Sequence, residues 1–172
     1  MNTFVALDFE TATSKRDSAC SLAIVTVVDG EIKETYHTFI RPPQNRYDSR
    51  NIHVHGITPE MTEFANDFRT AYHQIRKRLV GQVVVAHNES FDRSVLRNTM
   101  EYYNLPSEEL QLDKQWFCTY KLWKKEGLTP TTLRDCCDHF EIPLNHHDAI
   151  SDAEAAAKLF MIYQYYLKEI KE

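Results

Sequence analysis

The sequence has no apolar run that approaches the length of a membrane span, and it has no signal peptide or lipidation motif. It has only four cysteines, which include the adjacent pair Cys136 and Cys137 and lack the spacing of a disulfide framework. These absences argue against a membrane-spanning protein and against a secreted, disulfide-stapled one. We therefore expect a soluble, cytoplasmic protein with reduced thiols.

The chain also lacks internal repeats, linkers and low-complexity tracts. Its 172 residues are within the size range of one compact core, and the 42% of them that are hydrophobic can fill that core. We therefore expect a single domain over residues 1–172.

Two acidic residues follow the first apolar run of the chain. The run Thr3–Leu7 predicts a strand, and the period of two in a strand places Asp8 and Glu10 on the same face. Adjacent carboxylates repel each other unless a divalent cation neutralises them or one stays protonated. A solvated strand end is the other interpretation of this pair alone.

Two more acids lie at comparable places. Val83–Val85 predicts a strand buried on both faces, and Asp92 falls in the first turn of the helix predicted after it. Open α/β sheets hold their sites where strand ends lead into helices. Asp152 is near the start of the last predicted helix, for which Asp148 or Ser151 can act as N-cap.

These acids belong to three motifs, which are Asp-Phe-Glu-Thr at 8–11, His-Asn-x-x-Phe-Asp at 87–92 and His-x-x-x-x-Asp at 147–152. In this order they resemble the DnaQ-like 3′→5′ exonuclease family of the ribonuclease H-like superfamily, in its DEDDh form, and the chain is similar to the exonuclease domain of the DNA polymerase III epsilon subunit. His-Gly-Ile-Thr at 55–58 also matches a substrate-side segment of the family. The sister group has Tyr four residues before the last Asp, where this chain has Asp148.

The resemblance implies a metal-dependent exonuclease that releases nucleoside 5′-monophosphates from the 3′ end of single-stranded DNA or RNA. It implies two Mg²⁺ or Mn²⁺ ions roughly 3.5–4 Å apart, because such a pair can activate water and compensate the charge of the phosphate. Asp8 would bridge both ions, Glu10 and Asp152 would complete one site, and Asp92 would help to hold the second. His147 would accept the proton of the attacking water.

The resemblance also implies contacts with the substrate. Phe9 and Phe91 occupy positions that hold the terminal nucleotide in the family, and Thr11 lies where the 3′-hydroxyl is read. His55 would lie beside the substrate, and Asn88 would orient the junction between strand and helix by hydrogen bonds. Packing in the core is the other interpretation of Phe91, and it does not exclude a role at the floor of a pocket.

Three alternatives stay open on the sequence. His146 competes with His147 as the base, because only the spacing to Asp152 separates them. A zinc site at His53 and His55 is disfavoured, because no C-x2-C or H-x3-H spacing occurs. A catalytically silent nucleic-acid-binding module and a metal-dependent phosphatase or nucleotide hydrolase are the competing functions.

The charge of the chain bears on its partners. The formal net charge is −5 at pH 7, but four of the negative charges are the proposed ligands, which two divalent ions would cancel. The basic residues occur in small groups, which favours a short single-stranded or 3′-overhanging nucleic acid over a long duplex. We expect no membrane partner and see no polymerase-binding tail, so repair or RNA trimming is favoured over dedicated proofreading. A homodimer is possible, because some relatives are dimers.

The predicted fold is an α/β ribonuclease H-like fold. It has a central mixed five-stranded sheet, with three antiparallel strands first, flanked by helices. We expect strands at 3–7, 21–28, 31–40, 82–86 and 115–118 and helices at 67–80, 89–103, 132–140 and 149–170. Asp29-Gly30 predicts a two-residue hairpin, Thr58-Pro59-Glu60 a short helical turn, and residues 42–50 a loop.

Overall fold

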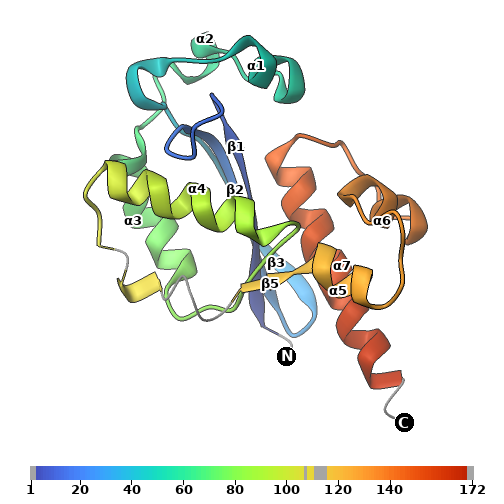
Figure 1. The fold of residues 1–172 in the computed structure, drawn as a ribbon. Helices are drawn as coiled ribbons and strands as arrows, with labels where there is room; N and C mark the ends of the chain where they lie inside the picture. Colours follow the sequence, from blue (N-terminus) through green and yellow to red (C-terminus); the bar gives the residue numbers. More distant parts are fainter. Residues whose placement is uncertain (1–2, 107, 111–115, 170–172) are drawn as a thin grey trace.

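The computed structural model describes residues 3–106, 108–110 and 116–169 (Figure 1). Its centre is a five-stranded sheet in the order β3-β2-β1-β4-β5. The strands are β1 (Phe4–Thr11), β2 (Ala19–Val28), β3 (Glu31–Phe39), β4 (Val84–Ala86) and β5 (Trp116–Cys118). The first three are antiparallel, and β4 and β5 run parallel to β1. The predicted mixed sheet, with three antiparallel strands first, is therefore confirmed.

The hairpin between β2 and β3 turns at Asp29 and Gly30, as predicted. Their φ angles are 54° and 77°, the left-handed values that a tight two-residue turn requires. The largest difference from a predicted strand is in β1, which continues beyond Leu7 to Thr11. Its last residues pair with β2, Asp8 opposite Ala23 and Glu10 opposite Ser21. The acidic pair therefore lies within a paired strand instead of beyond its end.

Helices cover both faces of the sheet (Figure 1). One face packs against α3 (Phe68–Leu79) and α4 (Glu89–Tyr102), and the other packs against α7 (Ala149–Glu169). The remaining helices are α1 (Ser49–His55), α2 (Pro59–Thr62), α5 (Thr119–Lys125) and α6 (Leu133–His139), with short 3-10 turns at Pro43–Asn45 and Glu108–Leu110. None of the helices in these described ranges is both long and apolar enough to cross a membrane.

The alternation of β1 assigns its side chains to the two layers. Val5 and Leu7 belong to the core under α3 and α4, whereas Phe4 and Ala6 belong to the core under α7. Because side chains alternate along a strand, the next even-numbered residues, Asp8 and Glu10, also lie on the α7 side of the sheet. The face of α7 toward the sheet is lined by small side chains, Ala149, Ala153, Ala156 and Ala157, which let the helix approach β1 closely.

The predicted helices begin near the expected residues. Asp67 caps α3 by accepting a hydrogen bond from the Thr70 amide, and Thr132 caps α6 in a reciprocal capping box with Asp135. Two helices were not predicted. The expected loop at 42–50 contains the start of α1, which buries none of its residues and so gives no periodic apolar signal, and α5 follows β5 without a break. The predicted start of the last strand, at Gln115, and the predicted end of the last helix, at Ile170, lie outside the described residues.

The parallel strands β1, β4 and β5 end at one edge of the sheet. At this edge α4 begins three residues after β4, and α5 begins directly after β5. The first turn of α7 lies there too, because Ala149 packs in the core beneath the sheet. Helix starts and strand ends therefore meet at the place where open α/β sheets build their sites.

Candidate active site

Three carboxylates meet at this edge of the sheet. One oxygen from each of Asp8, Glu10 and Asp152 lies within 4.8 Å of the others. The first two come from the α7 side of β1, and Asp152 comes from the first turn of α7. Glu10 and Asp152 are only 9% and 4% exposed, so this acidic group is largely removed from water.

Asp92 reaches the same place from the opposite layer. It lies in the first turn of α4, is 1% exposed, and its Oδ1 accepts a hydrogen bond of 2.9 Å from the amide of Phe9. Phe9 is the residue between Asp8 and Glu10, so this bond fixes the Asp92 carboxylate against the backbone of the acidic pair. This contact could not be predicted from the spacing of the motifs, because it joins residues 83 positions apart.

Protons bind these four carboxylates more tightly than usual. Burial, and then the charges of Asp92 and Glu10, raise the pKa of Asp8 well above its usual value. Burial and the neighbouring charges of Asp152 and Asp92 raise the pKa of Glu10 to about 8. Burial raises the pKa of Asp92 to about 8, against the hydrogen bond from Phe9, and burial raises that of Asp152 as well. Without a compensating positive charge, the charged cluster therefore opposes the folded state.

Two oxygens of the cluster fit a cation. Asp8 Oδ2 and Asp152 Oδ1 are buried and have no hydrogen-bond partner among the described residues. Buried polar atoms normally have such partners, and a missing one calls for an explanation such as an ion. Three carboxylates at one point, with that of Asp92 bonded to the backbone between Asp8 and Glu10, form the oxygen-rich set that hard divalent cations such as Mg²⁺ and Mn²⁺ select. The residues present therefore fit the predicted metal ions.

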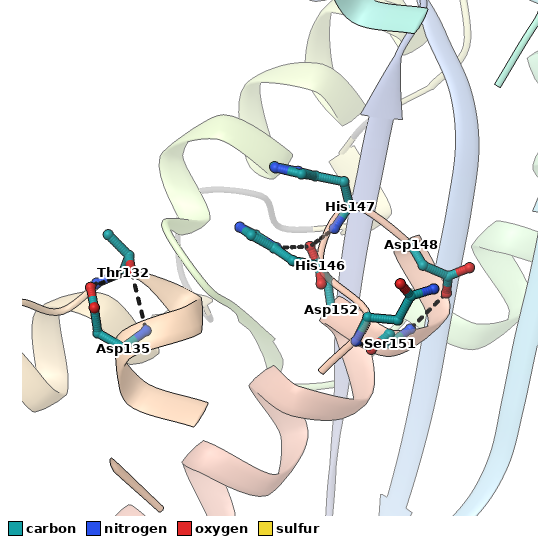
Figure 2. A network of polar contacts seen from close by, with 8 residues as sticks. Thr132, Asp135, His146, His147, Asp148, Ser151 and Asp152 are labelled. Atoms are coloured by element: carbon teal, nitrogen blue, oxygen red, sulfur yellow. Dashed lines mark hydrogen bonds and ion pairs between the residues drawn. The ribbon is translucent and has the colours of Figure 1, made fainter. Parts of the chain in front are cut away.

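The loop before α7 brings two histidines to Asp152 (Figure 2). Nδ1 of His146 lies 2.9 Å from Asp152 Oδ2, and the amide of His147 donates to the same oxygen at 3.2 Å. The two rings are stacked, with centroids 3.9 Å apart and an angle of 18° between planes. His147 is the exposed member and has a φ of 69°, so the loop turns sharply at this residue. The side chain that is hydrogen-bonded to Asp152 is thus that of His146, and one ring nitrogen of His147 lies within 4.8 Å of ligand atoms of both residues.

The N-terminus of α7 holds this loop in place. Asp148 Oδ1 accepts a hydrogen bond of 3.0 Å from the amide of Ser151. Of the two predicted N-cap residues, Asp148 and Ser151, the cap is therefore Asp148. The hydroxyl of Ser151 accepts instead from the amide of Asn145 at 2.8 Å. Both bonds tie the histidine loop to the first turn of the helix that carries Asp152.

A cavity of about 600 Å³ opens over the acids. Its walls include Asp8, Glu10, Asp152 and both neighbouring histidines, together with Phe9, His87, Asn88, Phe91, Tyr120, Thr132 and Leu133. Phe91 also packs against the core, so both interpretations of its side chain hold together. The structure thus brings most of the predicted site residues to one cavity.

Thr11 and His55 are predicted substrate residues that do not line this cavity. Nδ1 of His55 accepts from the Ile57 amide at 3.0 Å, so Nε2 must be the nitrogen that donates to the Thr11 carbonyl, 3.1 Å away. Burial lowers the pKa of His55, in keeping with a neutral ring. Asn51, which the sequence did not single out, donates to the same carbonyl at 2.8 Å. These contacts hold α1 against the end of β1.

The opposite wall of the cavity combines residues of the second motif with residues that follow β5. Nδ1 of His87 lies 2.9 Å from Thr119 Oγ1, and its ring meets the edge of Tyr120 at 6.0 Å. Burial lowers the pKa of His87 to about 4, so this ring is neutral near pH 7. Asn88 adopts a left-handed φ of 62° at the start of α4 and accepts from the Ser90 hydroxyl at 3.3 Å. Thr119 and Tyr120 follow β5 directly, which is the positional signal that could have identified them.

The raised pKa values predict that the metal-free protein loses stability as the pH rises. In the folded state Glu10 and Asp92 keep their protons up to about pH 8, and the pKa of Asp8 is raised as well, whereas the unfolded chain releases these protons near the usual pKa values of 3.8 and 4.5. The folded state then binds more protons in this interval, so its stability falls from about pH 4.5 to about pH 8. Asp8→Asn should raise the melting temperature in EDTA at about pH 8 by roughly 4–8 °C, for about 2 kcal/mol of relieved repulsion.

Thermal melts in EDTA across this pH range measure the effect, and Mg²⁺ should raise the wild-type melting temperature while raising that of Asp8→Asn less. Equal melting temperatures of the two proteins at every pH would show that the acids do not repel each other.

Comparison with known proteins identifies the family. The RNase_T family model, described as an exonuclease, matches residues 5–160. The DNA polymerase III PolC-type of Thermotoga petrophila is 28% identical over 172 residues, which cover 98% of this chain and 12% of that protein. The PolC-type polymerase of Streptococcus agalactiae serotype III is 29% identical over 178 residues, 99% of this chain and 11% of that protein. The chain thus spans about a tenth of the length of these curated relatives.

Solved structures share the fold at low sequence identity. The nuclease domain of 3′hExo, a DEDDh family member bound to rAMP, has a TM-score of 0.80 at 16% identity, over 96% of this chain and 92% of that one. Cell-death related nuclease 4 has a TM-score of 0.79 at 21% identity, over 96% and 64% of the two chains. Exonuclease X in complex with 5′ overhanging duplex DNA has a TM-score of 0.72 at 22% identity, over 94% and 91%.

The fold and the family predicted from the motifs are therefore confirmed. Because the family model covers residues 5–160, this chain belongs to the RNase_T exonuclease family and is a DnaQ-like, hydrolytic exonuclease of the ribonuclease H-like superfamily.

Proposed function

We propose that this exonuclease removes nucleoside 5′-monophosphates one at a time from the 3′ end of single-stranded DNA or RNA. The observation that carries the proposal is the buried cluster of four carboxylates, two of whose oxygens lack partners, beside a cavity that also exposes a histidine. Exonucleases of this type use divalent metal ions, and Asp8, Glu10, Asp92 and Asp152 would hold two Mg²⁺ or Mn²⁺ ions here. Bound ions would supply charge compensation for the phosphate and for the leaving 3′ oxygen.

His147 is the proposed general base. Its ring lines the cavity, and burial together with the nearby His146 lowers its pKa, so it is ready to accept a proton near neutral pH. His146 would act differently, because its Nδ1 is occupied by Asp152 Oδ2. It would orient that carboxylate and support the neighbouring ring by stacking.

The cavity is the proposed site of the terminal nucleoside. About 600 Å³ is within the usual range for sites that hold small molecules, and Phe91 offers an aromatic side chain on which any base can stack. The nuclease domain of 3′hExo, which shares this fold, was solved bound to rAMP, and this supports a nucleotide as the ligand. Thr11 and His55 would act indirectly, by holding the backbone at the end of β1.

The polarity of the reaction tests the proposal. A 3′-phosphate should slow hydrolysis of an oligonucleotide by roughly 100-fold or more, because a terminal phosphate dianion is repelled by the carboxylates and the 3′-hydroxyl is lost from the cavity. A 5′-phosphate should have little effect, and circular single-stranded DNA should resist. Chromatography of the products, with linear DNA and RNA of the same sequence side by side, measures all three. Rapid cleavage of the circle would contradict the proposed polarity.

Two other functions share parts of this site. A phosphatase or nucleotide hydrolase would cleave a mononucleotide ester at least as fast as the last linkage of an oligonucleotide, so both substrates belong in the same assay. A silent binding module would bind the oligonucleotide and release nothing with either Mg²⁺ or Mn²⁺. The raised pKa values disfavour this alternative, because a module without metal would carry the cost of four clustered acids for no purpose.

A further inference from the structure

We propose that the single strand leading to the 3′ end runs from the active-site cavity along α4 to a second pocket at Lys15, Arg46 and Tyr102. This inference rests on the proposed function, because it extends the binding site of the same substrate. We name the upstream part the α4 track. It consists of Arg16 and Phe91 next to the cavity, and of Lys15, Arg46 and Tyr102 at the far end.

The track begins where Arg16 covers Phe91. The guanidinium carbon lies 4.1 Å from the centre of the phenyl ring, and this ring also lines the active-site cavity. Arg16 is exposed, and its guanidinium lies over a ring that forms part of the cavity wall beside the acids. A cation so close to the acids, on the rim of the cavity, is suited to the phosphate that follows the terminal nucleotide.

The loop that carries Arg16 is fastened along α4. The main-chain carbonyl of Arg16 accepts a hydrogen bond of 3.3 Å from the buried hydroxyl of Thr99. Thr99 lies about two turns further along α4 than Phe91. The same loop continues to Thr13, Lys15 and Ser18, which line a second pocket of about 250 Å³. The two cavities are therefore neighbours across one short, fixed segment of chain.

The second pocket has the components of a single-strand site. The side chains of Lys15 and Arg46 line it, and neither makes a hydrogen bond or ion pair with another residue that the structure describes. Tyr102 forms another wall and is 50% exposed. A groove with cations for phosphates and an exposed aromatic ring for bases is the usual arrangement for single-stranded nucleic acid.

The helix sets the length of the track. Phe91 and Tyr102 are eleven residues apart, about three helical turns, so they lie on the same side of α4 and roughly 16 Å apart along its axis. At a stacked rise of about 3.4 Å per nucleotide, this distance holds at most about five nucleotides. The track therefore predicts that activity depends on substrate length up to about a pentanucleotide.

The charge of the second pocket favours moderate affinity. Two carboxylates, Asp17 and Asp48, line it together with the two cations, and Asp48 accepts from the Ser14 amide at 3.4 Å. The pocket is thus not strongly positive, and its contribution depends on stacking as well as on charge. A flexible single strand can place a base on Tyr102, whereas a duplex keeps its bases stacked and paired.

The length dependence of hydrolysis tests the track. For the wild type, kcat/KM should rise from a dinucleotide to a pentanucleotide and then level off toward a decanucleotide, with DNA and RNA of the same sequence in parallel arms. Tyr102→Ala should lower the ratio of kcat/KM for the pentanucleotide to that for the dinucleotide by roughly 5-fold to 100-fold. Lys15→Ala and Arg46→Ala should each reduce the salt dependence on the pentanucleotide by a slope of about 0.7.

Matched variants control for general effects. Tyr102→Phe keeps the ring and should keep the wild-type ratio. Tyr165→Ala and Lys77→Ala remove an exposed ring and an exposed charge elsewhere on the chain, and they should also keep it. A wild-type enzyme that hydrolyses both lengths equally, or a Tyr102→Ala ratio equal to that of the wild type, would overturn the track and leave the proposed exonuclease activity standing.

A measurement of oligonucleotide binding without hydrolysis tests the α4 track separately from the proposed exonuclease activity. Fluorescence anisotropy of a labelled decanucleotide, measured in EDTA on Asp8→Asn and on the double variant Asp8→Asn with Tyr102→Ala, needs no hydrolysis. The second protein should bind at least about 5-fold more weakly. If no substrate is hydrolysed by the wild type but this difference is found, the proposed activity fails and the track stands. Equal binding by the two proteins overturns the track.

Discussion

Asp8→Ala and Asp152→Ala are each expected to lower the turnover of a single-stranded oligonucleotide by roughly 1,000-fold or more, which corresponds to about 4 kcal/mol of transition-state stabilisation. The reason is that each variant removes a buried oxygen that has no partner among the described residues and that we assign to a metal ion. The fold should persist, because Asp8 only adds charge to a repelling cluster and Asp152 lies in the first turn of a long helix.

Steady-state rates with Mg²⁺ and with Mn²⁺, and circular dichroism of each variant, measure this prediction. Asp138→Ala is the matched control, because it removes an exposed acid from α6, away from the cluster. It should leave the rate within about twofold, as surface substitutions usually do. Wild-type turnover in both Asp8→Ala and Asp152→Ala would end the assignment of these carboxylates to metal ions.

His147→Ala is expected to lower kcat by about 100-fold to 10,000-fold with little change in KM, because a general base acts in the transition state. His146→Ala should have a smaller effect, about tenfold, since a hydrogen bond to a charged group contributes about 1.5 kcal/mol at the lower end of its usual range. Because His146 is hydrogen-bonded to Asp152, its loss should also change the Mg²⁺ concentration that gives the half-maximal rate.

Two substitutions separate the functions of His146. His146→Asn offers an amide near the position of Nδ1 and should restore much of the metal response, whereas His146→Phe keeps the aromatic stack with His147 but loses the bond to Asp152. Titrations of rate against Mg²⁺ concentration distinguish the variants. A larger loss of kcat in His146→Ala than in His147→Ala would assign the base to His146.

Local patterns in the sequence were sufficient for much of the fold. The alternation of β1, the Asp29-Gly30 turn and the caps at Asp67 and Thr132 depend on residues within a few positions of one another, so their meaning can be read before the chain folds. The order of the motifs pointed to the right family for the same reason, because each motif is a short segment with its own spacing. α1 escaped prediction because it buries no side chain and has no apolar stripe.

The assembly of the site depends on contacts between distant segments, which no local pattern contains. The bond from Phe9 to Asp92 and the choice of His146 as the partner of Asp152 arise where three layers meet. His55 illustrates this, because the two hydrogen bonds of its ring, to the amide of Ile57 just after α1 and to the carbonyl of Thr11 in β1, cannot be read from its motif. Local spacing specifies which residues can approach the edge of the sheet. The packing of α4 and α7 onto opposite faces sets which atoms touch there, because the core brings the acids together against their mutual repulsion.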